Sequence, residues 1–440
     1  MPQTSPIHAA YAQSFRCIGS TCEDTCCQGW NVPIDQAAYE KYQTLPATPL
    51  RTLMDTNILA MPEGAKPAGF AKIMMNGQNQ CPLLTADRLC GIQTELGEGY
   101  LSHACATYPR TINSIGGIEE TALALSCPEA ARLVLLTPDL PMPDSPAMEE
   151  PRTELTATGG TSSLQGWFPA IRQVVLALIR NRAYPLWQRL FLLSIFCRRL
   201  DTIASGELKR SVPAFLADFE ATVATGALRT AMETLPLDRA GQLDVVLRLA
   251  GMLLHRSNVR PRFVECVQAF TAGIGNGPGA TLDSLTAHYA QAHDRYYAPF
   301  FDQHTHILEN YLINTILRLR FPFGLEGARA RTPLSMAREC SLLTAQFTLM
   351  KGYLIGVAGF HREAFSSAHV VHTVQATSKH FEHHPEFLDL AYELLVESRM
   401  DGARGMAILL RNAEPKPLRP ASPEIHVPEP QDGRRVSTNS

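Results

Sequence analysis

Apolar residues recur every three or four positions through most of the chain after residue 164. The clearest series are Trp167, Ile171, Val174, Val175 and Leu178, then Leu186, Leu190, Leu193 and Phe196. This spacing puts apolar side chains on one face of an α-helix. Further amphipathic runs cover 206–235, 238–256, 260–272, 281–319, 333–359 and 365–411. Because alternating strand patterns are scarce and proline and glycine fall mostly between the runs, residues 164–414 are predicted to form an all-α domain.

The first 135 residues lack this periodicity and hold most of the cysteines. Glycine and proline recur at short intervals there, a pattern that predicts short helices and loops. Eight of the eleven cysteines lie in the first 127 residues: Cys17, Cys22, Cys26, Cys27, Cys81, Cys90, Cys105 and Cys127. Residues 1–135 are therefore predicted to form an irregular metal- or cluster-binding module, and the fold as a whole to be mainly α.

Two further segments have little apolar surface to bury. Residues 136–163 are rich in proline, acidic and small residues and are predicted to be a linker. Residues 415–440 contain six prolines and are predicted to be a disordered tail.

The close cysteines favour metal binding over disulfides. The N-terminus shows no basic segment followed by an apolar one, and no stretch approaches about 18 uncharged apolar residues. We therefore expect a cytoplasmic protein without a membrane span, whose thiols stay reduced. The adjacent pair Cys26–Cys27 also suits a metal better than a disulfide. Disulfides and inert thiols are the alternatives.

The spacing of the thiols bears on the kind of metal. Zinc sites favour two close pairs, whereas here the gaps are irregular and then long. Iron–sulfur clusters accept irregular spacing, since the inorganic core sets the geometry. We expect at least four of the eight cysteines to hold at least one [4Fe–4S] cluster, with zinc as the alternative.

Charge and motifs exclude several other functions. The formal net charge is −3 and no dense basic stripe is present, so nucleic acid is not an expected partner. The glycines of residues 273–279 are similar to a nucleotide-binding loop, but the run before them is helical and predicts a connection between two helices. No G-x-S-x-G elbow, P-loop or HExxH motif occurs.

Several short motifs resemble the flagellin lysine-N-methylases. In the first 130 residues they are Phe15-Arg-Cys17, Cys22-Glu-Asp-Thr-Cys26-Cys27-Gln-Gly-Trp30, Asn79-Gln-Cys81-Pro82-Leu83, Asp87-Arg88-Leu89-Cys90, Leu101-Ser102-His103-Ala-Cys105, Tyr108-Pro109-Arg110 and Leu125-Ser126-Cys127-Pro128-Glu129. Later in the chain they are Glu309-Asn310-Tyr311-Leu312 and Phe321-Pro322-Phe323-Gly324. The cysteine core alone is similar to a broader group of zinc- or iron-chelating proteins. The motifs at 309–324 favour the methylases over that group.

The resemblance implies a cytoplasmic enzyme that methylates flagellin lysines, with S-adenosylmethionine as donor and an iron–sulfur cluster. An iron–sulfur redox protein or a zinc-binding adaptor without methyl transfer is the alternative. The oligomeric state is left open.

Direct attack on a methyl sulfonium requires a neutral lysine nitrogen. Because a free lysine has a pKa of about 10.4, the enzyme must desolvate the ammonium or supply a base. In the resembling motifs, Glu309 and Tyr311 are the first catalytic candidates, and Tyr108 and His103 are further candidates. Pockets tend to form between domains, so we expect the donor in a cavity near the cysteine module or between it and the helical domain.

Overall fold

The fold is described from a computed structural model, which covers residues 7–8, 10–30, 32–62, 69–115, 118–141, 164–254, 260–324, 335–381 and 386–413. The structure is 67% helical and 6% strand, which confirms the mainly-α prediction. Residues 142–163 of the predicted linker and the whole predicted tail lie outside the described residues.

Most of the elements are helices. The α-helices are α1 (Ala10–Ser14), α2 (Gln36–Gln43), α3 (Pro49–Asn57), α4 (Gly91–Leu96), α5 (His103–Thr107), α6 (Pro128–Leu136), α7 (Phe168–Arg180), α8 (Leu186–Asp201), α9 (Leu208–Thr225), α10 (Arg229–Glu233), α11 (Arg239–Leu254), α12 (Pro261–Gly273), α13 (Leu282–Ala292), α14 (Ala298–Gln303), α15 (His306–Arg318), α16 (Met336–His361), α17 (Ser367–Phe381), α18 (Phe387–Glu397) and α19 (Ala403–Leu410). A π-helical turn, η6 (His293–Tyr297), joins α13 to α14. The strands are β1 (Ile7–His8), β2 (Pro33–Ile34), β3 (Ile58–Ala60), β4 (Ala71–Ile73), β5 (Arg110–Ile115) and β6 (Ile118–Leu123).

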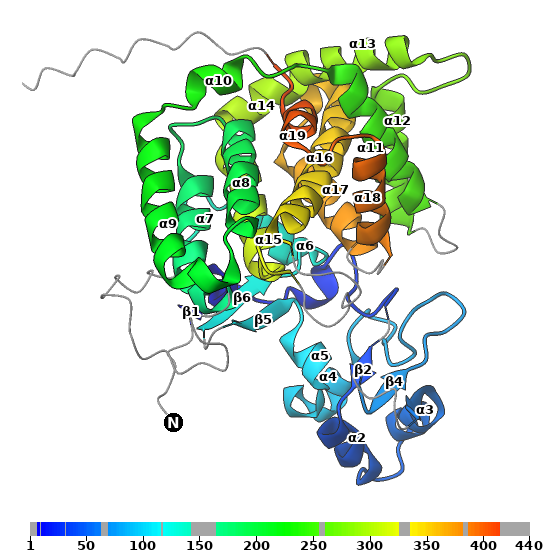
Figure 1. Cartoon of the computed structure of the whole chain (residues 1–440). Helices are drawn as coiled ribbons and strands as arrows, with labels where there is room; N and C mark the ends of the chain where they lie inside the picture. The colour runs from blue at the N-terminus through cyan, green and yellow to red at the C-terminus, as the bar shows by residue number, and fades with distance from the viewer. Residues whose placement is uncertain are drawn as a thin grey trace, which may run out of the picture.

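The helical body is built around α16 (Figure 1). Twenty of its 26 residues are buried, so this helix is covered on all sides and has no polar stripe. Glycines let α12 approach it closely, because a Cβ on Gly273 would lie 1.8 Å from the carbonyl oxygen of Gly356. The segment 273–279 joins α12 to α13, which confirms the predicted connection between two helices.

A small sheet lies under the body and was not predicted. Its strand order is β1-β6-β5, with β5 and β6 antiparallel and β1 parallel to β6. Asn314 of α15 fixes the body to this sheet, because its side chain bonds both the N–H (3.0 Å) and the carbonyl oxygen (2.8 Å) of Leu123. The Tyr11 hydroxyl donates to the side-chain oxygen Oδ1 of Asn314 at 2.9 Å.

The residues that the structure describes form two apolar cores, one of which includes residues on both sides of the predicted boundary at residue 135. Tyr11, Phe15 and residues 122–140 share one continuous core with the helical body. A second core, between Val32 and Ile92, belongs to a small lobe with the strand order β2-β4-β3 and helices α2, α3 and α4. Figure 1 shows this lobe below the body. The N-termini of α2 and α3 are capped by the side chains of Asp35 and Thr48.

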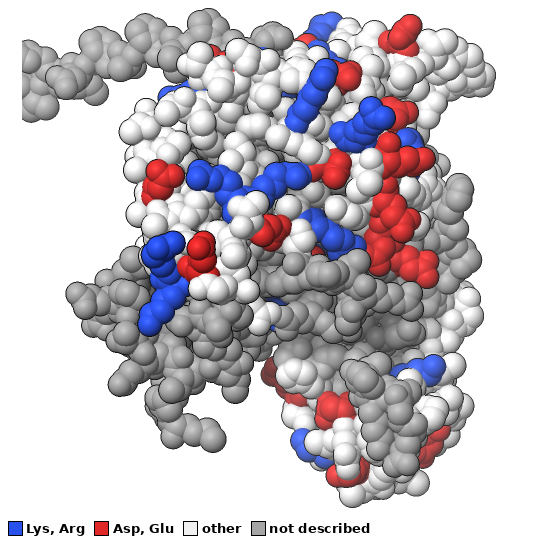
Figure 2. Space-filling model, in the orientation of Figure 1, with Lys and Arg blue, Asp and Glu red and all other residues white. Residues whose placement is uncertain are grey.

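The surface carries charges of both signs. Figure 2 shows them interspersed on one face, with acidic side chains gathered where α18 lies. Asp389 and Glu397 of that helix pair with Arg338 (2.6 Å) and Arg248 (2.9 Å). None of the helices in the described part of the chain is long and apolar enough to cross a membrane.

A lysine is buried at the centre of the body. The ammonium of Lys351 on α16 donates to the carbonyl oxygens of Leu409 (3.0 Å) and Leu410 (2.8 Å), at the end of α19. Burial lowers the pKa of Lys351 to about 7. The free carbonyls of a helix C-terminus are natural acceptors for such a donor. Lys351 therefore holds α19 against α16 even when its amine is neutral.

This buried lysine predicts a pH-dependent stability. An unfolded lysine titrates near pH 10.4, so between about pH 7 and 10 the unfolded chain binds a proton that the folded chain does not. The free energy of unfolding should therefore rise with pH in this window, by about 1.4 kcal/mol per unit from this group. We would measure urea unfolding of the wild type and of Lys351→Met at pH 7, 8 and 9. The free energy of unfolding should rise less steeply with pH in the variant, by this amount per pH unit. Equal slopes would contradict the assignment.

Candidate functional site

A polar cavity of about 520 Å³ lies between the small lobe and the helical body. The body contributes the start of α12 and one face of α17: Arg260, Pro261, Arg262, Phe263, Ala376 and Lys379. The remaining wall consists of Glu23, Asp24, Thr25, Gln28, Asn76, Gln80, Cys81, Pro82, Leu84, Thr85, Ala86 and Arg88. Pockets that bind small molecules often lie at such junctions and have volumes of about 300–1,000 Å³.

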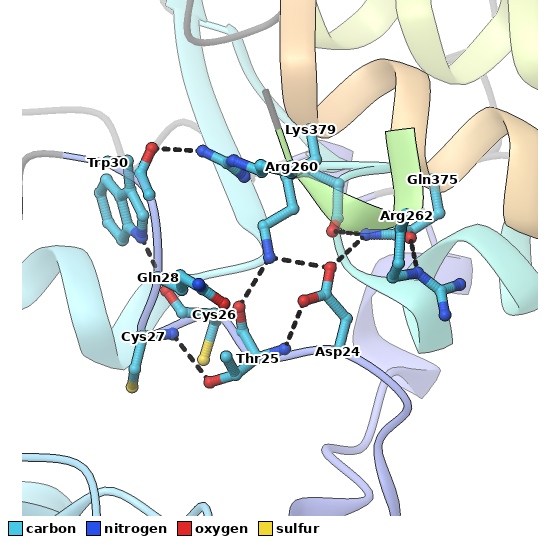
Figure 3. Close-up of polar contacts among 12 residues, drawn as sticks. Asp24, Thr25, Cys26, Cys27, Gln28, Trp30, Arg260, Arg262, Gln375 and Lys379 are labelled. Carbon is cyan, nitrogen blue, oxygen red and sulfur yellow. Dashed lines mark hydrogen bonds and ion pairs between the residues drawn. The ribbon is translucent and has the colours of Figure 1, made fainter. Parts of the chain in front are cut away.

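Lys379 connects α17 to the loop that carries two cysteines (Figure 3). Its ammonium donates to Oδ2 of Asp24 and to the carbonyl oxygen of Thr25, both at 2.8 Å. The side chains of Lys379 and Asp24 are only 7% and 13% exposed. Because Thr25 directly precedes Cys26, this pair sets the position of the Cys26–Cys27 backbone.

Gln375, one helical turn before Lys379, extends the network to a second loop. Its amide nitrogen donates to Oδ2 of Asp24 at 2.7 Å and to the carbonyl oxygen of Ser126 at 3.0 Å. Its amide oxygen accepts from Nε of Arg262 at 2.9 Å. Ser126 directly precedes Cys127, so one amide side chain contacts both cysteine-bearing loops.

Two more contacts fix the residues that follow Cys27. Arg260 donates to the carbonyl oxygen of Gly29. The indole Nε1 of Trp30 donates to the carbonyl oxygen of Cys26 at 2.7 Å. The segment 24–30 is therefore held by α17, by Arg260, which directly precedes α12, and by its own tryptophan.

The electrostatics of the junction favour its ion pair. Burial acts to raise the pKa of the Asp24 carboxyl, but the charge of Lys379 and hydrogen bonds from Lys379, Thr25 and Gln375 outweigh burial and hold that pKa below its usual range. Burial likewise lowers the pKa of Lys379, and the Asp24 carboxylate opposes this effect.

Four of the eight predicted ligand cysteines gather in the small lobe, and a fifth, Cys26, adjoins them. Cys81 is part of the lobe core, and Cys27, Cys90 and Cys105 pack against that core. The N–H of Cys81 donates to the carbonyl oxygen of Cys27 at 2.8 Å, so these two residues are neighbours. Burial raises the pKa of Cys105 to about 12, and the negative charges of Cys90, Cys26 and Cys81 add to this effect. Cys105 therefore lies within range of the charges of Cys90, Cys26 and Cys81.

Cys26 differs from the other thiols in its electrostatic surroundings. A hydrogen bond from Cys27 lowers the pKa of the Cys26 thiol to about 7 against the effect of burial, and Lys379 contributes to the lowering. Burial instead raises the pKa of Cys81 to about 11. Among these two, Cys26 is therefore the thiol that ionises more easily.

Of the other three cysteines, Cys127 packs against the core of the body. Burial raises the pKa of Cys127 to about 12, and the charges of Cys22 and Cys26 add to it. The pKa of Cys22 is raised by burial, with a smaller effect from Cys17. The thiols thus form two groups that adjoin at Cys26.

The donor chemistry of Cys26, Cys27, Cys81, Cys90 and Cys105 suits a thiolate-ligated cluster, since four of these thiols lie in or against one small core and Cys26 adjoins them. Across the described residues, no three His, Cys, Asp or Glu side chains converge as ligands of a single metal ion do.

The two catalytic candidates lie inside the body and do not line the cavity. Glu309 is 3% exposed, and its carboxylate accepts from Arg189 at 2.6 Å and from Arg182 at 2.9 Å. Tyr311 is 1% exposed, with its ring centroid 6.5 Å from that of Phe347. These contacts favour structural roles, while the catalytic role predicted for both residues stays a prediction.

The other two candidates lie closer to the cysteines. The Tyr108 ring stacks on Trp30 with centroids 6.1 Å apart, and its hydroxyl is 3.2 Å from the Ser126 hydroxyl. His103 begins α5, where its N–H donates to Asp35 at 2.7 Å. Neither residue lines the cavity.

The functional residues missed by sequence reasoning are those of the body that face the cavity. Asp24 lies within the Cys22–Cys26 motif, so the sequence did mark its neighbourhood. Gln375 and Lys379 are four residues apart, as on any helix face, and carry no local signal. Arg260 and Arg262 lie at the N-terminus of α12, on either side of Pro261, and also match no motif.

Residues 172–409 match the family model described as the FliB lysine N-methylase C-terminal domain. The match covers more than half of the chain, and the chain belongs to this family.

Individual relatives agree with the family match. A lysine-N-methylase of Salmonella typhimurium strain LT2 is 27% identical over 282 residues, which cover 61% of this chain and 67% of the relative. The lysine-N-methylase of Salmonella choleraesuis strain SC-B67 gives the same values. The flagellar biosynthetic protein FliU of Salmonella muenchen is 32% identical over 139 residues, which cover 32% of this chain and 82% of the relative. No solved structure matches the chain significantly.

The contacts of Glu309 lead to a prediction for Glu309→Gln. Removing the carboxylate charge leaves the guanidinium of Arg189, 7% exposed, buried without its counter-ion. We expect the free energy of unfolding to fall by about 3 kcal/mol, measured by urea unfolding. Methyl transfer per folded molecule should be unchanged if the role is structural. Unchanged stability together with lost transfer would contradict this account and support the catalytic role.

Proposed function

We propose that this protein is a cytoplasmic lysine N-methylase that acts on flagellin, with S-adenosylmethionine as the methyl donor. The observation that carries the proposal is the match of residues 172–409 to the FliB lysine N-methylase family. The names of the relatives support both halves of it, because two are lysine-N-methylases and a third is a flagellar biosynthetic protein.

The methyl donor is assigned to the cavity between the lobe and the body. The cavity volume of about 520 Å³ suits a ligand of nucleoside size, and its wall is rich in polar and charged groups. The loop residues Thr25 and Gln28, on either side of Cys26 and Cys27, line this cavity together with Cys81. The proposed donor site and the cysteines therefore adjoin.

The reaction is a direct transfer. The neutral lysine nitrogen attacks the methyl carbon, the carbon–sulfur bond breaks with its electron pair going to sulfur, and the donor leaves as the thioether. One N–H proton must also leave, because only about one free lysine in 10³ is neutral near pH 7.

The carboxylates that line the cavity are the proposed acceptors of this proton. Glu23 and Asp24 are the two available. Asp24 is held by Lys379 and Gln375. Glu23 pairs with Arg132 at 2.7 Å, but this pair is solvent-exposed, since the Glu23 side chain is 35% exposed and the Arg132 side chain 40%. Such an exposed pair is weak, so Glu23 is the better assignment.

A [4Fe–4S] cluster is proposed on at least four thiolates, drawn first from Cys26, Cys27, Cys81, Cys90 and Cys105. Zinc is the alternative metal. When bound, the cluster supplies cross-links between loops, and this binding energy adds to the stability of a lobe with a small core. The irregular spacing of these thiols and the core shared by Cys27, Cys81, Cys90 and Cys105 support iron–sulfur chemistry.

An iron–sulfur redox protein or zinc-binding adaptor is the competing function. It would need the thiols but neither the donor cavity nor flagellin.

The proposal is tested by co-expressing flagellin with this protein and weighing the intact flagellin by mass spectrometry. We expect increments of about 14 Da on flagellin lysines, because each methyl group replaces one hydrogen. The purified protein should contain iron and acid-labile sulfide near four per chain.

Cys26→Ala should lower both the iron and sulfide content and the methylation, while Cys197→Ala is the matched control. Cys197 is fully buried in α8 and should cost packing only. Unmodified flagellin in the presence of cluster-loaded protein would discard the methylase and favour the redox function. Stoichiometric zinc without sulfide would discard the cluster alone.

A further inference from the structure

The cavity is cationic on its body side. Four cationic side chains line it, from Arg88, Arg260, Arg262 and Lys379, against the carboxylates of Glu23 and Asp24. Both carboxylates are already paired, Asp24 with Lys379 and Glu23 with Arg132. Among the residues that the structure describes, no carboxylate pairs with Arg262 or Arg88. Positive charge is therefore left over in a cavity of ligand size.

Arg262 is the best oriented of these groups. Its Nε donates to the amide oxygen of Gln375 at 2.9 Å, and the Gln375 amide nitrogen is anchored on Asp24 and on Ser126. This contact uses one edge of the guanidinium and leaves the other nitrogens for a ligand. A guanidinium is planar, so fixing one edge also fixes the direction of the rest, and that geometry matches both oxygens of a carboxylate.

The start of α12 adds a second favourable feature. The helix begins at Pro261 after Arg260, whose side chain makes no capping hydrogen bond, and this first turn lines the cavity. The N-terminus of a 13-residue helix carries a partial positive charge that favours an anion. Arg262 and the helix end therefore act in the same direction on a negative group between them.

We propose that Arg262 binds the α-carboxylate of the amino-acid part of the methyl donor, with Arg88 as a second contact from the lobe. This inference rests on the proposed function, since it names the end of the donor that the body recognises. Arg88 is exposed, in the turn after Asp87, where it can reach a ligand at the cavity mouth. Arg262 supplies the directional contact because, unlike Arg88, its guanidinium is held by a partner side chain, that of Gln375.

The test compares two ligands that differ only in this carboxylate. S-Adenosylhomocysteine carries it, and its decarboxylated analogue, S-adenosyl-3-thiopropylamine, does not. Calorimetry on the full-length, cluster-loaded protein should show the first ligand binding roughly ten- to a hundred-fold more tightly, as for a charged hydrogen bond.

In Arg262→Gln this preference should fall below about three-fold, with the affinity for the decarboxylated analogue unchanged. Arg262→Lys keeps the charge without the planar fork and should give an intermediate preference. Arg210→Gln is the matched control, because Arg210 on α9 has a side chain 85% exposed and pairs only with Glu207 among the described residues.

The outcomes separate the inference from the function. Full preference in Arg262→Gln, or equal weakening of both ligands, overturns the carboxylate contact and leaves the methylase proposal intact. If Arg262→Gln does not fold, full wild-type preference in Arg262→Lys overturns the directional contact. Wild-type protein that binds neither ligand overturns the donor cavity itself, and flagellin mass spectrometry then decides the function separately.

Discussion

The arrangement of the candidate site depends on one buried ion pair, between Lys379 of the helical body and Asp24 of the cysteine-bearing loop. Burying an ammonium is costly unless a charge and hydrogen bonds compensate for it, and here Asp24 and the Thr25 carbonyl do so. Removing one partner of such a pair costs about 3–5 kcal/mol. The loop is therefore held in one place relative to the body.

Both the cavity and the cysteine arrangement follow from this constraint. Lys379 and Asp24 are themselves part of the cavity wall, so their ion pair joins the two sides of the cavity. Gln375 binds both Asp24 and the carbonyl oxygen of Ser126, so it also fixes the loop that contains Cys127. The body therefore provides more than a scaffold, because it sets the relative positions of loops that the chain separates by about a hundred residues.

Local patterns predicted what depends on local physics. Apolar periodicity predicted the helices after residue 164, whereas the metal-binding module predicted from the clustered cysteines stays a prediction. The division of the cores was not predictable, because Tyr11 joins the body through Asn314, a contact across 303 positions. The role of Lys379 was equally unpredictable from the sequence. Its partner Asp24 lies 355 residues away, and a single lysine in a helical sequence usually indicates a solvent-exposed side chain. The motif at 309–312 marked structurally important residues, and Glu309 pairs there with two arginines.

Amide hydrogen exchange on Lys379→Met tests most directly whether the body positions the cysteine loops. We expect exchange in residues 24–30 and 126–127 to accelerate by at least about ten-fold, because the variant removes about 1.4 kcal/mol or more of local stability. Exchange in α16 should be unchanged. Lys209→Met, at an exposed position of α9, is the control and should match the wild type. Unchanged protection of both loops in Lys379→Met would contradict the account.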